Sequence, residues 1–158
     1  MIEAGKKIKD FKVTITDGSA QKLSAFAGTA GLVVYFYPKD STPGCTSEAC
    51  DFRDQHAALK RLGYGVVGVS LDSVKSHQKF TEKQKLNFPL IADESRELAE
   101  AFGAYGEKKM YGKTFLGVIR STFVLDAKLK VQLVYPKVKV AGHVAQIIAD
   151  IKTMGKAS

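Results

Sequence analysis

The sequence has little cysteine and no tryptophan: its 158 residues include only Cys45 and Cys50. A chain of this length buries roughly two thirds of its unfolded surface, so it needs no disulfide staple. Two cysteines in a reducing compartment are more often catalytic than structural. The cysteine content therefore points to thiol chemistry.

Long apolar runs are also missing. None approaches the length of a membrane span, and the first residues, Met-Ile-Glu-Ala-Gly-Lys-Lys, lack the apolar core of a signal peptide. We therefore expect no membrane contact and a cytoplasmic location. Internal repeats, linkers and low-complexity stretches are absent as well, which predicts a single domain over residues 1–158.

Acidic residues are outnumbered by basic ones, 16 to 24, and the formal net charge is +8. The lysines are spread along the chain without the basic and aromatic interleaving of a specific nucleic-acid surface. We therefore expect a solvated basic surface, no specific nucleic-acid partner, and weak steering of acidic redox partners.

The apolar pattern predicts an α/β sandwich in which strands and helices alternate. An N-terminal hairpin or paired extension is expected from residues 11–16 and the Asp17-Gly18 turn signal. Further strands are predicted at residues 32–37, 66–71, 88–91, 120–125 and 130–135, the last two as a hairpin. Helical segments are predicted at residues 23–26, 43–62, 74–86, 95–102 and 142–154, and residues 103–117, with four glycines, as a long loop.

Both cysteines lie in segment 38–54, directly after the buried strand predicted at residues 32–37. Pro43 pushes Thr42 toward the extended backbone of a helix N-cap and itself suits the first helical position. Cys45 then falls in the first turn, where free backbone N–H groups and the helix dipole stabilise a thiolate. This layout resembles the active sites of thioredoxin-fold proteins.

The spacing of the two cysteines is unsuited to a disulfide within an intact helix. Residues five apart on a helix place their Cα atoms roughly 8.6 Å from each other, whereas a disulfide needs about 4.4 to 6.8 Å. A bridge would require the first turns to unwind, so we infer a local unfolding coupled to oxidation. The alternative is a pair of buried structural cysteines without chemistry.

Three separated segments resemble one enzyme family. Pro38-x-x-x-Thr42-x-x-Cys45 matches the peroxiredoxin active-site pattern, and its continuation through Asp54 is similar to the peroxiredoxin Q, or bacterioferritin comigratory protein, subfamily. Residues 103–126 and 137–143 are similar to the same subfamily. The resemblance implies a thioredoxin-like fold: a central mixed β-sheet flanked by helices, with an N-terminal β-hairpin extension.

The activity that this resemblance implies is a thiol-dependent peroxidase that reduces hydrogen peroxide and organic hydroperoxides without a cofactor or metal. Cys45 is the implied peroxidatic nucleophile, which becomes a sulfenic acid. Cys50 is the implied resolving cysteine, since no cysteine follows it. The intramolecular disulfide would be reduced by thioredoxin or a glutaredoxin-like donor, and internal resolution leads us to expect a monomer.

The resemblance also supplies donors for the reacting atoms. Thr42 is expected to bridge thiolate and peroxide through its hydroxyl, and Arg120 to donate from its guanidinium to two of the reacting atoms. The backbone N–H groups of Gly44 and Cys45 complete the set. Read without the family, Thr42 is only an N-cap and Arg120 a charge at a strand start.

Three further residues are expected to support the site. Pro38 and Pro43 end the strand, fix the turn and shield the thiolate from water. Glu48 is expected to hold an arginine, either Arg120 or Arg53, with plain solvation as the alternative.

The histidines offer no metal-ligand spacing, so no metal site is expected. His56 lies on the inward stripe of its helix and is predicted to be a packed histidine, whereas His77 and His143 are predicted at the surface or at helix caps.

Two other functions fit parts of the sequence. The same thiols could serve a disulfide oxidoreductase or redox sensor, which would exchange with protein disulfides and react slowly with peroxide. The positive surface could serve a holdase-like or nucleic-acid-associated protein, which would be retained on a polyanion at physiological salt.

Overall fold

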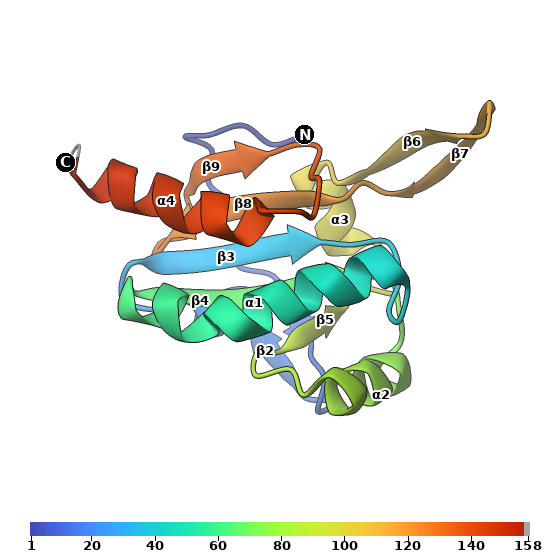
Figure 1. The fold of residues 1–158 in the computed structure, drawn as a ribbon, viewed down its shortest axis with the longest axis horizontal. Coiled ribbons are helices and arrows are strands. Elements are labelled where there is room, and N and C mark those ends of the chain that lie inside the picture. The colour runs from blue at the N-terminus through green and yellow to red at the C-terminus, as the bar shows by residue number, and fades with distance from the viewer. Residues whose placement is uncertain (157–158) are drawn as a thin grey trace.

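A five-stranded mixed sheet forms the centre of the computed structural model, which describes residues 1–156 (Figure 1). Its strands lie in the order β5-β4-β3-β8-β9. Their bounds are Leu90–Ala92 for β5, Tyr64–Ser70 for β4, Gly31–Phe36 for β3, Ser121–Asp126 for β8 and Val131–Tyr135 for β9. β3 pairs in parallel with β4 and antiparallel with β8, and β8 and β9 form the predicted hairpin.

Strand β3 is buried on both faces, as its continuous apolar run predicts. Side chains alternate across a strand, so Leu32, Val34 and Phe36 enter one apolar cluster. Val33 and Tyr35 enter the other. The strand therefore lies at the centre of the molecule, and its C-terminal end is the point from which the cysteine helix starts.

Within residues 1–156, four α-helices cover the sheet. They are α1 (Pro43–Arg61), α2 (Val74–Gln84), α3 (Glu97–Phe102) and α4 (His143–Lys156). Apolar residues of α1, α2 and α4 join the cluster on one face, and those of α3 join the cluster on the other. Helices on both faces of a mixed sheet confirm the predicted α/β arrangement.

The N-terminal segment lies on the α3 side of the sheet. Strands β1 (Lys12–Thr14) and β2 (Ala20–Lys22) form the predicted antiparallel hairpin, and the short helical turn η1 (Leu23–Phe26) follows. Val13, Ile15 and Leu23 enter the apolar cluster of that face, which fixes the extension to the sheet.

The prediction of a long loop at residues 103–117 is wrong. Strands β6 (Tyr105–Met110) and β7 (Lys113–Val118) form an antiparallel hairpin that projects away from the rest of the protein (Figure 1). Its two-residue turn has positive φ at Tyr111 (54°) and Gly112 (76°), the twist that joins paired strands tightly. Because this hairpin is not part of the central sheet, its sequence carries no alternating apolar face, and the glycines dominate the pattern.

No helix within residues 1–156 combines the length and the apolar character that crossing a bilayer requires.

Candidate active site

The register of the central sheet brings the two ends of the candidate site together. Phe36, the last residue of β3, pairs with Ser121, the first residue of β8. The chain leaves β3 toward the start of α1, and Arg120 immediately precedes β8. Cys45 and Arg120 therefore meet where β3 ends and β8 begins, although they are 75 positions apart in sequence.

Arg120 contacts two of the predicted site residues at once. Its Nη2 donates to Cys45 Sγ at 3.2 Å, and its Nη1 donates to Glu48 Oε1 at 2.7 Å. The predicted ion pair of Glu48 with an arginine thus forms, and the partner is Arg120. A guanidinium that is held from one side by a carboxylate presents its other nitrogen to the sulfur in a fixed direction.

Glu48 is fully buried beneath this arginine. Its Oε2 has no hydrogen-bond partner among residues 1–156. Burial raises the pKa of Glu48 to about 7, against the opposing effect of the Arg120 charge. The carboxyl group therefore titrates close to neutral pH while it positions the guanidinium.

Helix α1 begins as the sequence predicts. Pro43 occupies the first helical position and Thr42 the N-cap, with extended backbone at φ −82° and ψ 153°. Cys45 lies in the first turn and is only 1% exposed. A Cβ at Gly44 would lie 3.3 Å from Arg120 Nη2, so glycine leaves room for the guanidinium. Pro38, half-buried, separates β3 from this turn.

The Thr42 side chain does not act as a helix cap. No side-chain cap hydrogen bond is present, and the hydroxyl donates instead to the Lys39 carbonyl oxygen at 2.8 Å. The N-cap position is correct, but the hydroxyl closes the loop before the helix. The backbone N–H groups of the first turn are therefore not occupied by this side chain.

Cys50 lies one turn and a half further along the same intact helix. Both cysteines are free thiols. Cys50 is partly exposed and donates from Sγ to Gln84 Oε1 at 3.6 Å, and Arg53 donates to the Gln84 carbonyl oxygen at 2.6 Å. The middle of α1 is thus attached to the C-terminal end of α2, and a disulfide would require these contacts and the first turns to open.

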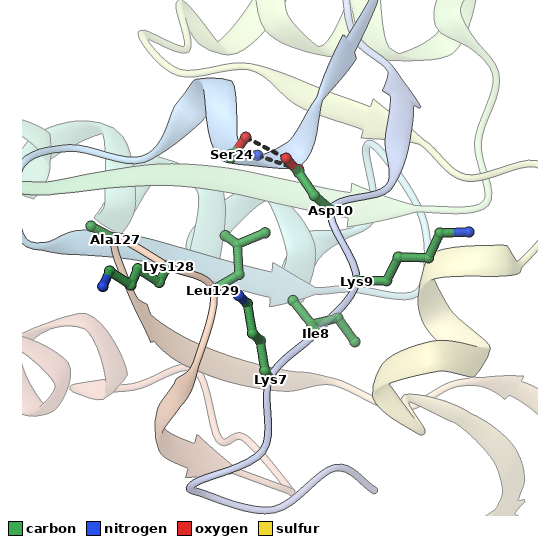
Figure 2. Close-up of a pocket in the computed structure, with 8 residues that line it drawn as sticks. All are labelled: Lys7, Ile8, Lys9, Asp10, Ser24, Ala127, Lys128 and Leu129. Carbon is green, nitrogen blue, oxygen red and sulfur yellow. Dashed lines mark hydrogen bonds between the residues drawn. The ribbon is translucent and has the colours of Figure 1, made fainter.

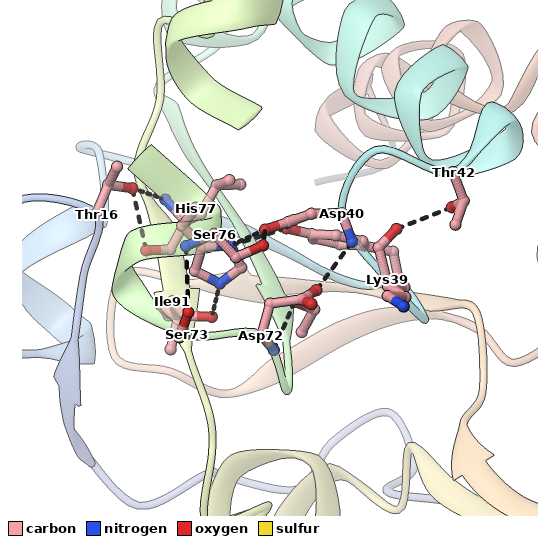
Figure 3. A network of polar contacts seen from close by, with 12 residues as sticks. Thr16, Lys39, Asp40, Thr42, Asp72, Ser73, Ser76, His77 and Ile91 are labelled. Carbon is pink, nitrogen blue, oxygen red and sulfur yellow. Dashed lines mark hydrogen bonds and ion pairs between the residues drawn. The ribbon is translucent and has the colours of Figure 1, made fainter. Parts of the chain in front are cut away.

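A buried polar network next to the site was not predicted (Figure 3). His77 is fully buried, so its predicted surface position is wrong. Its Nδ1 lies 2.7 Å from Asp40 Oδ2, and its Nε2 lies 2.9 Å from the Ile91 carbonyl oxygen. Asp40 also accepts hydrogen bonds from the hydroxyls of Tyr37 and Ser76.

The His77 contacts fix the number of protons that the pair must hold. A carbonyl oxygen can only accept, so Nε2 carries a proton. Nδ1 faces a carboxylate oxygen, so a second proton lies between His77 and Asp40, whichever of the two holds it. Asp40 lies between β3 and α1, so this pair ties the loop before Cys45 to helix α2.

Asp40, Asp72 and His77 also place three potential metal-ligand atoms within 4.8 Å of one another. Each of them already has partners in the protein: Asp72 accepts from the Asp40 backbone N–H and from the Ser70 hydroxyl. These hydrogen bonds account for the close placement of the three side chains.

His143, at the start of α4, is also more buried than predicted. It is 7% exposed, its Nε2 lies 2.8 Å from the Thr122 hydroxyl, and its ring packs edge-on against Tyr135. His56 packs against Phe88, as its inward position predicts. His143 stands between Gly142 and Val144 and gives no sequence signal for burial, because its partner Thr122 is 21 positions away.

A pocket of about 600 Å³ lies on the side of the N-terminal segment and contains neither cysteine (Figure 2). Lys9 and Lys128 point away from each other at its rim, and Asp10 is engaged by Ser24 through two hydrogen bonds. It holds none of the residues that the sequence predicted for the site.

Comparison with known proteins identifies the family. Residues 4–134 match the AhpC/TSA family. This chain belongs to the AhpC/TSA family. Within this family it resembles the peroxiredoxin Bcp of Bacillus subtilis, with 44% identity over 155 residues that cover 98% of each chain. It is 40% identical to the peroxiredoxin Bcp of Escherichia coli K12 over 142 residues, 90% of each chain.

Solved structures agree with this assignment. Peroxiredoxin Q of Xanthomonas campestris superimposes with a TM-score of 0.87 at 44% identity, covering 95% of this chain and 97% of that one. The same TM-score, at 42% identity and with 96% and 99% coverage, relates this chain to the X. campestris bacterioferritin comigratory protein. The chain is therefore a peroxiredoxin of the subfamily that its motifs resembled, and its predicted thioredoxin-like fold is confirmed.

Proposed function

We propose that this peroxiredoxin reduces hydrogen peroxide and organic hydroperoxides with Cys45 as the nucleophile. The observation that carries the proposal is the Arg120 guanidinium, 3.2 Å from a buried cysteine in the first turn of α1. The X. campestris bacterioferritin comigratory protein is described for alkyl peroxide reduction activity, which supports including organic hydroperoxides among the substrates.

In the proposed reaction the Cys45 thiolate attacks one oxygen of the peroxide. The O–O bond breaks, sulfur is oxidised to the sulfenic acid, and the departing oxygen takes a proton and leaves as water or an alcohol. Negative charge develops on the departing oxygen. Arg120 and the backbone N–H groups of Gly44 and Cys45 are the donors that would stabilise it.

The remaining site residues have supporting roles in this proposal. The Thr42 hydroxyl donates a hydrogen bond to the Lys39 carbonyl oxygen, so its own oxygen would accept a hydrogen bond from the peroxide O–H. Glu48 holds Arg120, while Pro38 and Pro43 shape the turn and limit access of water. These side chains bind and orient the reacting groups, and none of them needs to transfer a proton.

Cys50 is proposed as the resolving cysteine. Its thiol would attack the Cys45 sulfenic acid, forming the S–S bond and releasing water, after the first turns of α1 open. A dithiol donor, thioredoxin or a glutaredoxin-like protein, would then reduce this disulfide by thiol–disulfide exchange. The donor becomes oxidised to a disulfide, and Cys45 and Cys50 return to thiols. Because Cys45 is 1% exposed in the folded helix, only a small molecule can reach its sulfur there. A cytoplasmic location and a monomeric state remain predictions.

The decisive experiment is intact mass analysis of the reduced protein after one equivalent of hydrogen peroxide. We expect the wild type to lose two hydrogens, and Cys50→Ser to gain one oxygen on Cys45. Cys45→Ser is the matched control and should leave peroxide unconsumed. Peroxide turnover by Cys45→Ser would overturn the proposed function. A wild type that gains oxygen and keeps a free Cys50 would leave the peroxidase in place but assign resolution to an external thiol.

A further inference from the structure

The β6–β7 hairpin exposes most of the large apolar side chains that this protein leaves uncovered. Met110 is 54% exposed, Tyr111 96%, Phe115 42% and Leu116 63%. Scattered apolar residues on a surface need no explanation, but four on one projecting hairpin indicate an interaction site. The hairpin is a two-stranded sheet of its own, and such a sheet is marginally stable without a partner.

The pairing register divides the hairpin into two faces. Lys108 pairs with Phe115 and Met110 with Lys113, so these four side chains share one face. Lys108 Nζ lies over the Phe115 ring at 5.9 Å from its centre, as a shared face requires. We call this face, with Tyr111 at its tip, the arm face. Leu116 pairs with Glu107 and lies on the opposite face.

The arm face is continuous with the candidate active site. Gly106 and Gly117 pair at its base, and a Cβ at Gly106 would lie 3.5 Å from Cδ1 of Ile119, the residue before Arg120. Burial and the positive charge of Arg120 also lower the pKa of Lys108. Gly117, on the arm face, is three residues from Arg120. A protein that reaches the thiols of this peroxiredoxin would therefore meet the base of the hairpin and then its tip.

The turn between β6 and β7 has an unfavourable backbone conformation at Tyr111. Tyr111 has φ 54°, a left-handed conformation that asparagine and glycine adopt easily and that is uncommon for an aromatic residue. An Asn-Gly turn would stabilise the hairpin better. A strained and 96% exposed tyrosine at the tip is consistent with a binding role, because tyrosine is enriched among the residues that dominate interfaces.

Charge decides which partner the arm face fits. Lys108 and Lys113 frame Met110 and Phe115, and the whole chain carries a net charge of +8. A second copy of this chain would bring the same positive charge and would be repelled. A partner with an apolar patch inside an acidic rim would be attracted.

From this continuity and charge we propose that the arm face is the docking surface for the protein that reduces the oxidised enzyme, an acidic dithiol reductase of the thioredoxin kind. The inference rests on the proposed function, since that cycle is what brings a reductase to the thiols. Apolar contacts of Met110, Tyr111 and Phe115 hold the reductase, and the lysines steer it.

The test compares Tyr111→Asn/Phe115→Thr with Leu116→Thr, the control on the opposite face. Asparagine suits the left-handed turn and threonine suits a strand, so the hairpin persists in both proteins. Peroxide turnover is measured with thioredoxin, thioredoxin reductase and NADPH, and separately with dithiothreitol. We expect kcat/KM for thioredoxin to fall about tenfold in the double variant only, while turnover with dithiothreitol and the single-turnover oxidation of Cys45 stay unchanged.

Charge reversal gives a second comparison. Lys113→Glu, on the arm face, should lower kcat/KM for thioredoxin more than Lys109→Glu on the other face, and the difference should shrink as salt is added.

The outcomes separate the docking proposal from the proposed function. Equal kcat/KM for thioredoxin in the wild type and the double variant would overturn the docking surface and leave the peroxidase intact. Turnover with dithiothreitol but none with thioredoxin would overturn the partner assignment. A wild type that fails to consume peroxide with either donor would overturn the proposed function itself. Dimerisation of the wild type that the double variant abolishes, or sedimentation with anionic vesicles, would assign the arm face to a different partner.

Discussion

Arg120 determines how the site is assembled. Its two terminal nitrogens face different partners, Cys45 Sγ and Glu48 Oε1. A lysine would place a single ammonium between them, whereas the planar guanidinium reaches both without moving. Glu48 is buried because of this geometry, and its raised pKa is the cost of placing a carboxyl group beneath the arginine.

The buried His143 side chain makes the stability of the protein depend on pH. Burial, with a smaller effect of the Arg120 charge, lowers the pKa of His143 from 6.5 to about 4. The native state then binds fewer protons than the unfolded state between these values, so the stabilisation is present above pH 6.5 and is lost as pH falls toward 4. Between pH 7 and pH 5 we expect the wild type to lose about 1 to 2 kcal/mol more unfolding free energy than His143→Gln.

Urea denaturation of the two reduced proteins at both pH values measures this difference. Glutamine keeps an amide near the Thr122 hydroxyl, so the comparison isolates the titration. Glu48 acts in the opposite sense, because its raised pKa makes stability fall as pH rises through about 7. Its contribution is common to both proteins and cancels. Equal losses in wild type and variant would contradict the prediction.

Helix α1 has a reactive first turn, and its middle is held by contacts to α2. Cys45 lies in its first turn, and Cys50 and Arg53 contact Gln84 at the end of α2. If Cys45 and Cys50 form a disulfide, the first turns unwind, and the backbone near Arg53 becomes accessible to trypsin.

We therefore expect faster tryptic cleavage after Arg53 in the peroxide-treated wild type than in the reduced protein. Cleavage is followed by mass spectrometry, with the rate after Arg96 in the loop before α3 as the internal reference. Peroxide-treated Cys50→Ser is the matched control, because it cannot form the disulfide and should be cut at the reduced rate. Equal rates after Arg53 in reduced and oxidised wild type would remove the case for local unfolding.

Elements whose signals are local were predictable from the sequence. Pro43 and Gly63 mark the two ends of α1, and the Ser73 side chain caps α2 by accepting from the Ser76 N–H. The β6–β7 hairpin was missed because only its base, at Tyr105 and Val118, packs on the core, so no periodic apolar pattern runs along its strands. Burial of His77 was missed for a related reason: its partners Asp40 and Ile91 are 37 and 14 positions away.

The Asp40–His77 pair joins segments of the molecule that are separated in the sequence. Asp40 follows β3, His77 belongs to α2, and Ile91 belongs to β5. Asp72, after β4, accepts from the Asp40 backbone N–H at 2.9 Å. The loop that leads to the reactive cysteine is thus fixed by polar contacts to one half of the sheet, and its position depends on the integrity of the whole network.

This arrangement predicts an unequal double-mutant cycle. His77→Ala leaves the Asp40 carboxyl buried without its ring partner and should cost about 3 to 5 kcal/mol of unfolding free energy. Asp40→Asn should cost less, because its amide can donate to Nδ1 of a neutral His77 that still donates to Ile91. The double variant should be more stable than His77→Ala alone, since asparagine removes the unpaired charge.

Urea denaturation of the reduced proteins at pH 7 measures all three variants. Ser76→Ala, expected to cost about 1 kcal/mol, is the control for the loss of one neutral donor. Additive losses would show that His77 and Asp40 are not coupled, and the loop before Cys45 would then be held by packing alone.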